Sequence, residues 1–167
     1  MPYRVCFVCS GNICRSPTAE VVLRRLLADA GLGEDVSVDS AGLGAWHVGQ
    51  PADVRTVAAL RARGYDAARH CARQFRTADF AGRDLVVALD SGHERDLLAL
   101  APTEADRDKV RLLRSYDREA AGGTGDLDVP DPYYGGDPGF EHVLDLVESA
   151  CRGLLAEVRA AVGETAR

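Results

Sequence analysis

A cysteine and an arginine separated by five residues stand directly after an apolar run near the N-terminus. Cys9 follows residues 5–8, which are typical of a buried strand, and Arg15 ends the loop before a helical pattern. Loop amides and the positive end of a helix dipole then converge on one point and form a site for a tetrahedral oxyanion. The amides and the guanidinium pull the thiol towards thiolate, and the planar fork of Arg15 matches two phosphate oxygens. This loop predicts phosphoryl transfer through a cysteinyl-phosphate.

The isolated spacing also has an ordinary explanation, because cysteine after an apolar strand is often a small buried hydrophobe. Two further features favour the catalytic interpretation. The Gly11-Asn12 pair suits a tight loop, and the Ser16-Pro17 pair suits a helix start. We therefore predict a helix that begins at Pro17 with Ser16 as its N-cap.

A second candidate group lies in residues 126–134, within a long segment rich in Asp, Gly and Pro. A cysteinyl-phosphate route needs an acid for the leaving oxygen and then a base for the hydrolytic water. Asp131 stands between two prolines that restrict its backbone, and Tyr133 and Tyr134 could wall a pocket for an aromatic ring. Asp-Pro pairs are also common in surface turns. Beside the cysteine loop, the segment favours Asp131 as the acid and base, with Asp128 as the alternative.

Apolar runs and helical patterns alternate along the chain. We expect strands at residues 4–9, 36–40, 85–89 and 110–113. We expect helices at residues 17–30 and 51–64, after the third strand as far as Leu100, and at residues 140–162, with a long loop at 114–139. This order predicts one domain over residues 1–167, a flavodoxin-like three-layer α/β sandwich with a four-stranded parallel sheet. Ligands of such sheets bind beyond the strands' carboxyl ends, where Cys9, Ser40 and Asp90 are expected to share a rim.

Composition narrows the classes of function. The 167 residues carry 20 Lys and Arg against 26 Asp and Glu, a net charge of −6, so nucleic acid is not the expected partner. No apolar run approaches a membrane span, and no signal-peptide pattern precedes the first strand. Five cysteines without framework spacing favour a reducing cytoplasm. Neither paired C-x2-C motifs nor histidine clusters occur, so we expect no metal and no cofactor.

Five segments of the chain together resemble the low-molecular-weight protein tyrosine phosphatases. They occur in the family's order and span nearly the whole chain: residues 9–16 (CSGNICRS), 38–42 (VDSAG), 46–49 (WHVG), 72–74 (ARQ) and 131–134 (DPYY). The Arg-rich composition resembles that of an actinobacterial member of the family. The resemblance implies hydrolysis of phosphotyrosine without a metal, with Cys9 as nucleophile, Arg15 as phosphate clamp and Asp131 as general acid and base.

The resemblance also implies roles for the residues around the nucleophile. Asn12 matches the family's left-handed loop asparagine, a conformation that Asn tolerates better than most residues. Its expected partners are Ser16, Ser40 and His70, and Ser16 is also expected to bond the Cys9 sulfur. Asp90 matches the acidic residue that supports the phosphate loop. The phosphoryl oxygens are expected to lie against the backbone of Ser10, Gly11, Asn12, Ile13, Cys14 and Arg15.

Substrate preference and regulation follow from side chains at the same loop. A relative that dephosphorylates arginine carries threonine at the position of Ile13. The apolar side chain of Ile13 instead favours a substrate with a flat aromatic ring. Trp46, Tyr133 and Tyr134 would complete the walls of this pocket. Cys14 could capture an oxidised Cys9 as a disulfide, as the family's second loop cysteine suggests. The expected partners are tyrosine-phosphorylated proteins or a cognate kinase, and the expected state is a monomer or weak dimer.

Two other functions compete with this interpretation. An arsenate reductase uses a similar fold and cysteine loop but needs resolving cysteines near the third strand, and residues 80–100 contain none. A noncatalytic phosphoprotein-binding module would have lost the nucleophile, the arginine or the aspartate, and all three are present.

Overall fold

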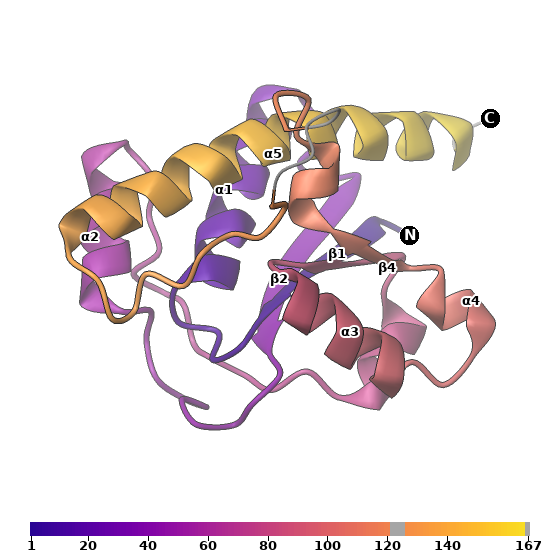
Figure 1. The fold of residues 1–167 in the computed structure, drawn as a ribbon. Helices are drawn as coiled ribbons and strands as arrows, with labels where there is room; N and C mark the ends of the chain where they lie inside the picture. The colour runs from indigo at the N-terminus through magenta and orange to yellow at the C-terminus, as the bar shows by residue number, and fades with distance from the viewer. Residues whose placement is uncertain (121–125, 166–167) are drawn as a thin grey trace.

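A four-stranded parallel sheet forms the centre of the molecule in the computed structural model, which describes residues 1–120 and 126–165 (Figure 1). Its strands are β1 (Tyr3–Cys9), β2 (Val36–Gly42), β3 (Leu85–Ala88) and β4 (Val110–Leu112). They lie in the order β2-β1-β3-β4, and every neighbouring pair is parallel. The predicted α/β class and the four-stranded parallel sheet are confirmed.

Alternating side chains of β1 feed two separate cores. Val5 and Phe7 pack with the buried faces of α1 (Arg15–Asp29) and α5 (Asp137–Thr165), and α2 (Val54–Ala62) packs on α5. Cys6 and Val8 point to the opposite face, which is covered by α3 (Ser91–Leu100) and η1 (Thr77–Gly82). Helices on both faces make the three layers seen in Figure 1. The short elements α4 (Glu104–Arg107) and η2 (Leu113–Tyr116) flank β4.

The start of α1 differs from the prediction. The helix begins at Arg15, and its N-cap is Cys14, which makes no side-chain capping bond. Ser16 is not the cap, because its hydroxyl is bonded to the Cys9 sulfur and the Asn12 amide instead. The serine that looked like a helix signal is part of the loop's internal hydrogen bonding.

Other boundaries also differ from the prediction: β3 and β4 each end one residue earlier, and α5 extends three residues further at both ends than the predicted 140–162. Strand β2 continues two residues past Ser40, because its ladder with β1 runs on to the pair Cys9 and Gly42. Helix α2 begins at Val54 rather than at Pro51, since Asp53 caps it by accepting from the Arg55 amide. The segment predicted as a loop at 114–139 contains part of η2 and the first turn of α5, and its residues 121–125 lie outside the described residues.

The carboxyl ends of the strands form one rim. Cys9 ends β1, and its Cα partner on β2 is Gly42. Asp90 follows β3 and caps α3 by accepting from the His93 amide. Within residues 1–120 and 126–165, no helix has the length and apolarity that a membrane crossing requires.

Candidate active site

The loop between β1 and α1 is held from outside through its carbonyl groups. Five of them accept hydrogen bonds from surrounding donors: Cys9 O from Leu43 N, Ser10 O from Gly44 N, Asn12 O from His70 Nε2, Ile13 O from Asp53 N, and Cys14 O from Thr18 N and Oγ1. The N–H and C=O of a trans peptide point in opposite directions. The N–H groups of the same five peptides therefore face the inside of the loop, which is the arrangement of an anion-binding nest.

Asn12 fixes the curvature of this loop. It is the one non-glycine residue with positive φ among those described, at 60°. Its Nδ2 donates to Ser16 Oγ at 2.8 Å and to Ser40 Oγ at 2.9 Å, and its Oδ1 accepts from the Arg73 amide at 3.0 Å. The side chain is fully buried behind the loop and does not line the cavity. His70 contacts the carbonyl of Asn12 and not its side chain.

Cys9 lies at the floor of a cavity of ≈ 360 Å³. Its side chain is buried, and its Sγ is 2.9 Å from Ser16 Oγ. A hydroxyl at that distance can donate to a thiolate, which stabilises the charged sulfur. The cysteine therefore combines a reactive position with a direct hydrogen-bond partner.

Arg15 reaches the same cavity from the first turn of α1. Its Nη1 donates to Asp90 Oδ2 at 2.8 Å and to the carbonyl of Val129 at 3.1 Å. Burial opposes the charged form of Asp90, but the His93 amide and the Arg15 guanidinium hold the pKa of this carboxyl below its ordinary value. The pairing fixes the guanidinium and leaves Nη2 facing Asp131, whose Oδ2 is 3.6 Å away.

Asp131 approaches Arg15 from the loop before α5. Its Oδ1 accepts from the Tyr133 amide at 3.0 Å, so the carboxylate is oriented by its own turn. The next residues are held by Arg55, which donates to Gly135 O and lies 5.5 Å from the centre of the Tyr133 ring. Asp128 lies elsewhere, bonded to the Ser91 amide at 2.7 Å, and is not among the lining residues.

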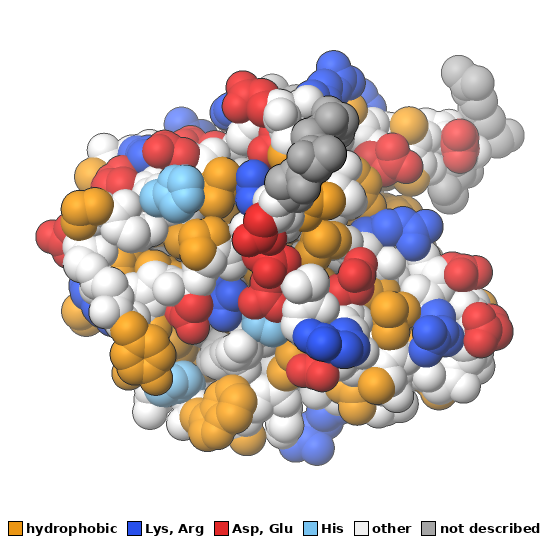
Figure 2. Space-filling model, in the orientation of Figure 1, with side chains coloured by type: hydrophobic (Ala, Val, Ile, Leu, Met, Phe, Trp, Pro, Cys, Tyr) orange, Lys and Arg blue, Asp and Glu red, His pale blue; other side chains and the backbone are white. Residues whose placement is uncertain are grey.

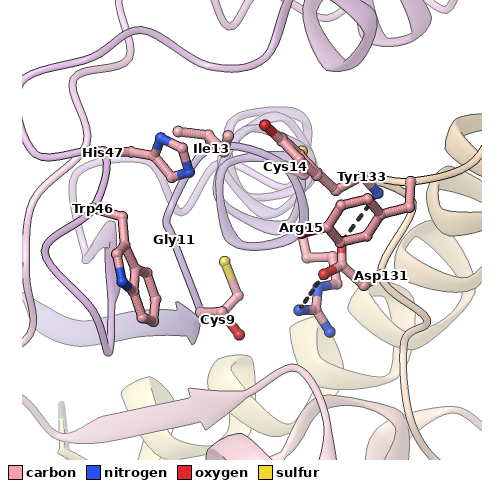
Figure 3. A pocket seen from close by; sticks show the side chains of 11 residues that line it. Cys9, Gly11, Ile13, Cys14, Arg15, Trp46, His47, Asp131 and Tyr133 are labelled. Carbon is pink, nitrogen blue, oxygen red and sulfur yellow. Dashed lines mark hydrogen bonds and ion pairs between the residues drawn. The ribbon is translucent and has the colours of Figure 1, made fainter.

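Aromatic side chains form the mouth of the cavity (Figure 3). Trp46 lies on one side of Cys9, Asp131 and Tyr133 lie on the other, and His47 and Ile13 lie between them. Tyr134 also lines the cavity and packs edge-on against Tyr133 at 4.9 Å. Figure 2 shows large hydrophobic side chains beside a histidine on one face of the molecule. Of the side chains that line the cavity, Trp46 is 72% exposed and Tyr134 is 92% exposed. A flat ring carrying a phosphate matches these walls and this floor.

Comparison with known proteins decides the family. The model for "low molecular weight phosphotyrosine protein phosphatase" matches residues 4–164. The chain belongs to this family. Members hydrolyse phosphotyrosine through a cysteinyl-phosphate intermediate, and the chain is a protein-tyrosine phosphatase of this kind.

Similar proteins come from distant organisms. A low molecular weight protein-tyrosine-phosphatase of Streptomyces coelicolor is 63% identical over 95% of each chain. Phosphatase A of Mycobacterium tuberculosis is 51% identical, over 92% of this chain and 90% of its own. A crystal structure of an Entamoeba histolytica tyrosine phosphatase with Hepes in the active site has a TM-score of 0.88 and 34% identity, covering 95% of this chain and 98% of that one.

The sequence did not point to several residues of the phosphatase site, among them Gly42, His93 and the cavity-lining His47. Gly42 is required because a Cβ there would lie 2.9–3.1 Å from the backbone of residues 10–12. His93 is buried, with Nε2 2.8 Å from Ser10 Oγ and Nδ1 3.2 Å from Asp90 Oδ1, although Nδ1 is not aligned for a hydrogen bond. Burial and the Arg15 charge lower the pKa of His93 to about 4. His93 lies three residues after Asp90 in the sequence, but no local pattern indicates its contact with Ser10.

Cys14 lies beside the phosphatase cavity and is buried. Burial raises the pKa of its thiol to about 12. Cys14 is therefore a neutral thiol at physiological pH. Groups of three or more His, Cys, Asp or Glu able to hold a metal ion are absent from the described part of the chain.

Proposed function

We propose that Cys9, Arg15 and Asp131 carry the phosphatase reaction. The observation that carries this assignment is their meeting in one cavity, with the Cys9 sulfur on the floor and the Arg15 Nη2 3.6 Å from Asp131 Oδ2. The nucleophile and the cation come from the two ends of one loop, and the carboxylate comes from the segment before α5. Their juxtaposition supports a common role in chemistry.

The first half of the reaction moves the phosphoryl group to sulfur. The Cys9 thiolate attacks phosphorus, a sulfur–phosphorus bond forms, and the phosphorus–oxygen bond to tyrosine breaks. Asp131, protonated at this stage, gives its proton to the departing phenolic oxygen. The inward amides of the loop and Arg15 stabilise the charge that is spread over the three equatorial oxygens in the transition state.

The second half returns the enzyme to its starting state. Asp131, now a carboxylate, takes a proton from water while the water oxygen attacks phosphorus. The sulfur–phosphorus bond breaks, inorganic phosphate leaves, and the Cys9 thiolate is regenerated with Ser16 as its hydrogen-bond partner. One carboxyl group therefore serves as acid and then as base.

The walls of the cavity support a preference for phosphotyrosine over phosphoserine and phosphoarginine. Ile13, Trp46, Tyr133 and Tyr134 give apolar and aromatic surfaces at the depth where the ring of the substrate would lie. A phosphoserine is too short to place its phosphate on the floor and still fill these walls. Phosphoarginine would leave its guanidinium unpaired against Ile13.

The proposal extends to the setting of the enzyme. The family model covers residues 4–164, which supports a single domain over the whole of residues 1–167. The five cysteines are all free, which supports action in a reducing cytoplasm. The substrates are tyrosine-phosphorylated proteins, among which a cognate kinase is one candidate, and the enzyme works as a monomer or weak dimer without a cofactor.

Matched phosphopeptides test the specificity. One peptide sequence carrying phosphotyrosine, phosphoserine or phosphoarginine is incubated with the wild type and with Ile13→Thr, in EDTA, and phosphate release is measured. We expect the phosphotyrosine peptide to have the highest kcat/KM and Ile13→Thr to narrow its lead over phosphoarginine. A comparable kcat/KM for phosphoarginine in the wild type contradicts the proposal. Arsenate turnover with thioredoxin would instead support the reductase alternative.

A further inference from the structure

Glu20 is a buried carboxylate that the proposed reaction does not use. It lies on α1, one turn after Ser16, with 9% of its surface exposed. Its Oε1 accepts from the Ser40 hydroxyl at 2.6 Å, and its Oε2 pairs with Arg24 Nη1 at 2.6 Å. Arg24 is itself half exposed and also donates to the carbonyl of Val38. The carboxylate therefore bridges the half-exposed Arg24 on α1 and the buried Ser40 behind the loop.

An unbroken chain of hydrogen bonds runs from Glu20 to the Cys9 sulfur through Ser40, Asn12 and Ser16. The Asn12 Oδ1 is taken by a backbone amide, so its Nδ2 end must donate, and it donates to both serines. Each serine oxygen then accepts from Asn12 and has one proton left to give.

The two serine protons have different destinations. The proton of Ser40 goes to Glu20, a carboxylate that can only accept. The proton of Ser16 has a choice between Cys9 Sγ at 2.9 Å and the carbonyl of Ala41 at 3.5 Å. The thiolate takes it, because the sulfur is the nearer and the charged acceptor.

We infer that Glu20 is a positioning residue that orients the Ser40 hydroxyl and, through Asn12, keeps the Ser16 proton on the Cys9 thiolate. The inference rests on Cys9 being the nucleophile, as proposed above. Glu20 Oε1 accepts the hydroxyl proton of Ser40, so the Ser40 oxygen is left to accept from Asn12 Nδ2. With that acceptor in place, Asn12 stays tightly bonded in its left-handed conformation and holds Ser16 in register.

The amide isostere shows why a carboxylate is needed. A glutamine at position 20 has one accepting end and one donating end, whereas Glu20 accepts at both. Arg24 can only donate, so the glutamine oxygen turns to Arg24 and its NH₂ turns to Ser40. The Ser40 proton then faces a donor, and its bond with Asn12 is weakened. If Arg24 is also removed, the glutamine oxygen is free to turn back to Ser40.

The expected rescue of Glu20→Gln by removal of Arg24 can be tested by experiment. Wild type, Glu20→Gln, Arg24→Met and the double variant are alkylated with iodoacetamide across a pH series, and modification of Cys9 is localised by fragmenting the tryptic peptide of residues 5–15. The hydrogen bond from Ser16 to the charged sulfur is weakened, so we expect Glu20→Gln to move the half-reaction pH of Cys9 upward by about one unit and to lower kcat roughly tenfold. The KM should change little, because Arg15 and the loop amides are intact.

The controls separate positioning from simple helix packing. Arg24→Met should alkylate and turn over like the wild type, and adding it to Glu20→Gln should restore most of the loss. A wild-type profile for Glu20→Gln overturns the inference. So does an Arg24→Met variant as impaired as Glu20→Gln, since Glu20 would then act only by tying α1 to β2. Failure of the nucleophile assignment itself shows separately, as turnover by Cys9→Ser.

Discussion

The floor and the mouth of the cavity are built in opposite ways. On the floor, Cys9 and Arg15 are 3% and 5% exposed, and Arg15 is fixed by a carboxylate and a backbone carbonyl. At the mouth, Trp46 and Tyr134 are 72% and 92% exposed. The bond-making groups thus sit in a rigid, desolvated setting where electrostatic interactions are strong, while the groups that meet the substrate protein remain adaptable.

This difference predicts unequal tolerance to substitution. A buried charge that loses its partner is costly, so a change on the floor disturbs every group that faces it. A change at the mouth removes contact area and little else. The largest effects are therefore expected on the floor, and smaller ones at the side chains beside it.

Replacing Arg15 should have the largest effect. Arg15→Lys keeps one positive charge but loses the planar fork that bonds Asp90 and receives two phosphate oxygens. We expect kcat/KM for p-nitrophenyl phosphate to fall by roughly 10³-fold or more. Arg25→Lys is the matched control, since Arg25 lies on the same helix, is half exposed and should tolerate the change. Retention of half the wild-type rate by Arg15→Lys would remove the clamp from the account.

Asp131 and Asp128 should behave differently. Asp131→Ala removes the acid beside Arg15 and should slow turnover by about 10²–10⁴-fold, with a smaller loss for substrates whose leaving group needs little protonation. Asp128→Ala frees the Ser91 amide and should cost much less, because Asp128 does not line the cavity. A leaving-group series of aryl phosphates measures both. If Asp128→Ala were slow and Asp131→Ala turned over normally, Asp128 and not Asp131 would be the general acid.

His93 makes stability depend on pH. Its pKa is about 4 in the folded protein, because of burial and Arg15, against 6.5 ordinarily. Between these values the unfolded chain binds a proton that the folded protein does not, so the free energy of unfolding rises with pH. The contribution of His93 to this free energy is lost as pH falls from 6.5 towards 4. The full difference is roughly 3 kcal/mol, at about 1.4 kcal/mol for each pKa unit. The free energy of unfolding of the wild type, measured in urea at pH 4.5 and at pH 7, should differ by most of this amount.

Two histidine variants isolate this contribution. His93→Gln should flatten the pH dependence of the free energy of unfolding, because the titrating group is gone. His142→Gln should leave it unchanged, since His142 is exposed on α5. Equal pH slopes for wild type and His93→Gln would show that His93 is not held neutral in the fold.

Cys14 should affect recovery from oxidation and leave catalysis nearly untouched. Peroxide converts the Cys9 thiolate to a sulfenic acid, and the Cys14 thiol then displaces water to form a disulfide that protects Cys9. Because burial raises the pKa of Cys14 to about 12, we expect this closure to be slow near pH 7 and to accelerate as pH rises. Cys14→Ser should keep near-normal turnover but lose most of the activity that dithiothreitol restores to wild type. Equal recovery in both proteins contradicts the protective role.

The sequence identified the groups whose neighbours are close along the chain. Cys9 and Arg15 share one loop, and Asp131 lies between two prolines, so local pattern was sufficient to find them. Gly42, His93 and Glu20 could not be found in this way, because their roles come from contacts made across the sheet. His93 meets Ser10, 83 positions away, and Gly42 matters only because β2 brings it against the backbone of the loop.

Ser16 shows the opposite error. Its place before Pro17 is typical of an N-cap, yet the loop uses its hydroxyl for Asn12 and Cys9. A local rule of helix starts was overridden by the hydrogen bonds of the site. The helix begins two residues earlier than predicted, with no side-chain cap, because its first turn belongs to the anion cradle.

Rapid-quench trapping of a phosphoenzyme tests the central claim most directly. Asp131→Ala is mixed with ³²P-labelled p-nitrophenyl phosphate, whose leaving group needs little protonation, and is quenched within milliseconds to seconds. The enzyme is then digested, and its labelled peptide is sequenced. Loss of the base should slow hydrolysis of the intermediate, so we predict label on sulfur at Cys9 and none in the matched Cys9→Ser/Asp131→Ala protein. Label on another residue, or turnover by Cys9→Ser, would contradict the account.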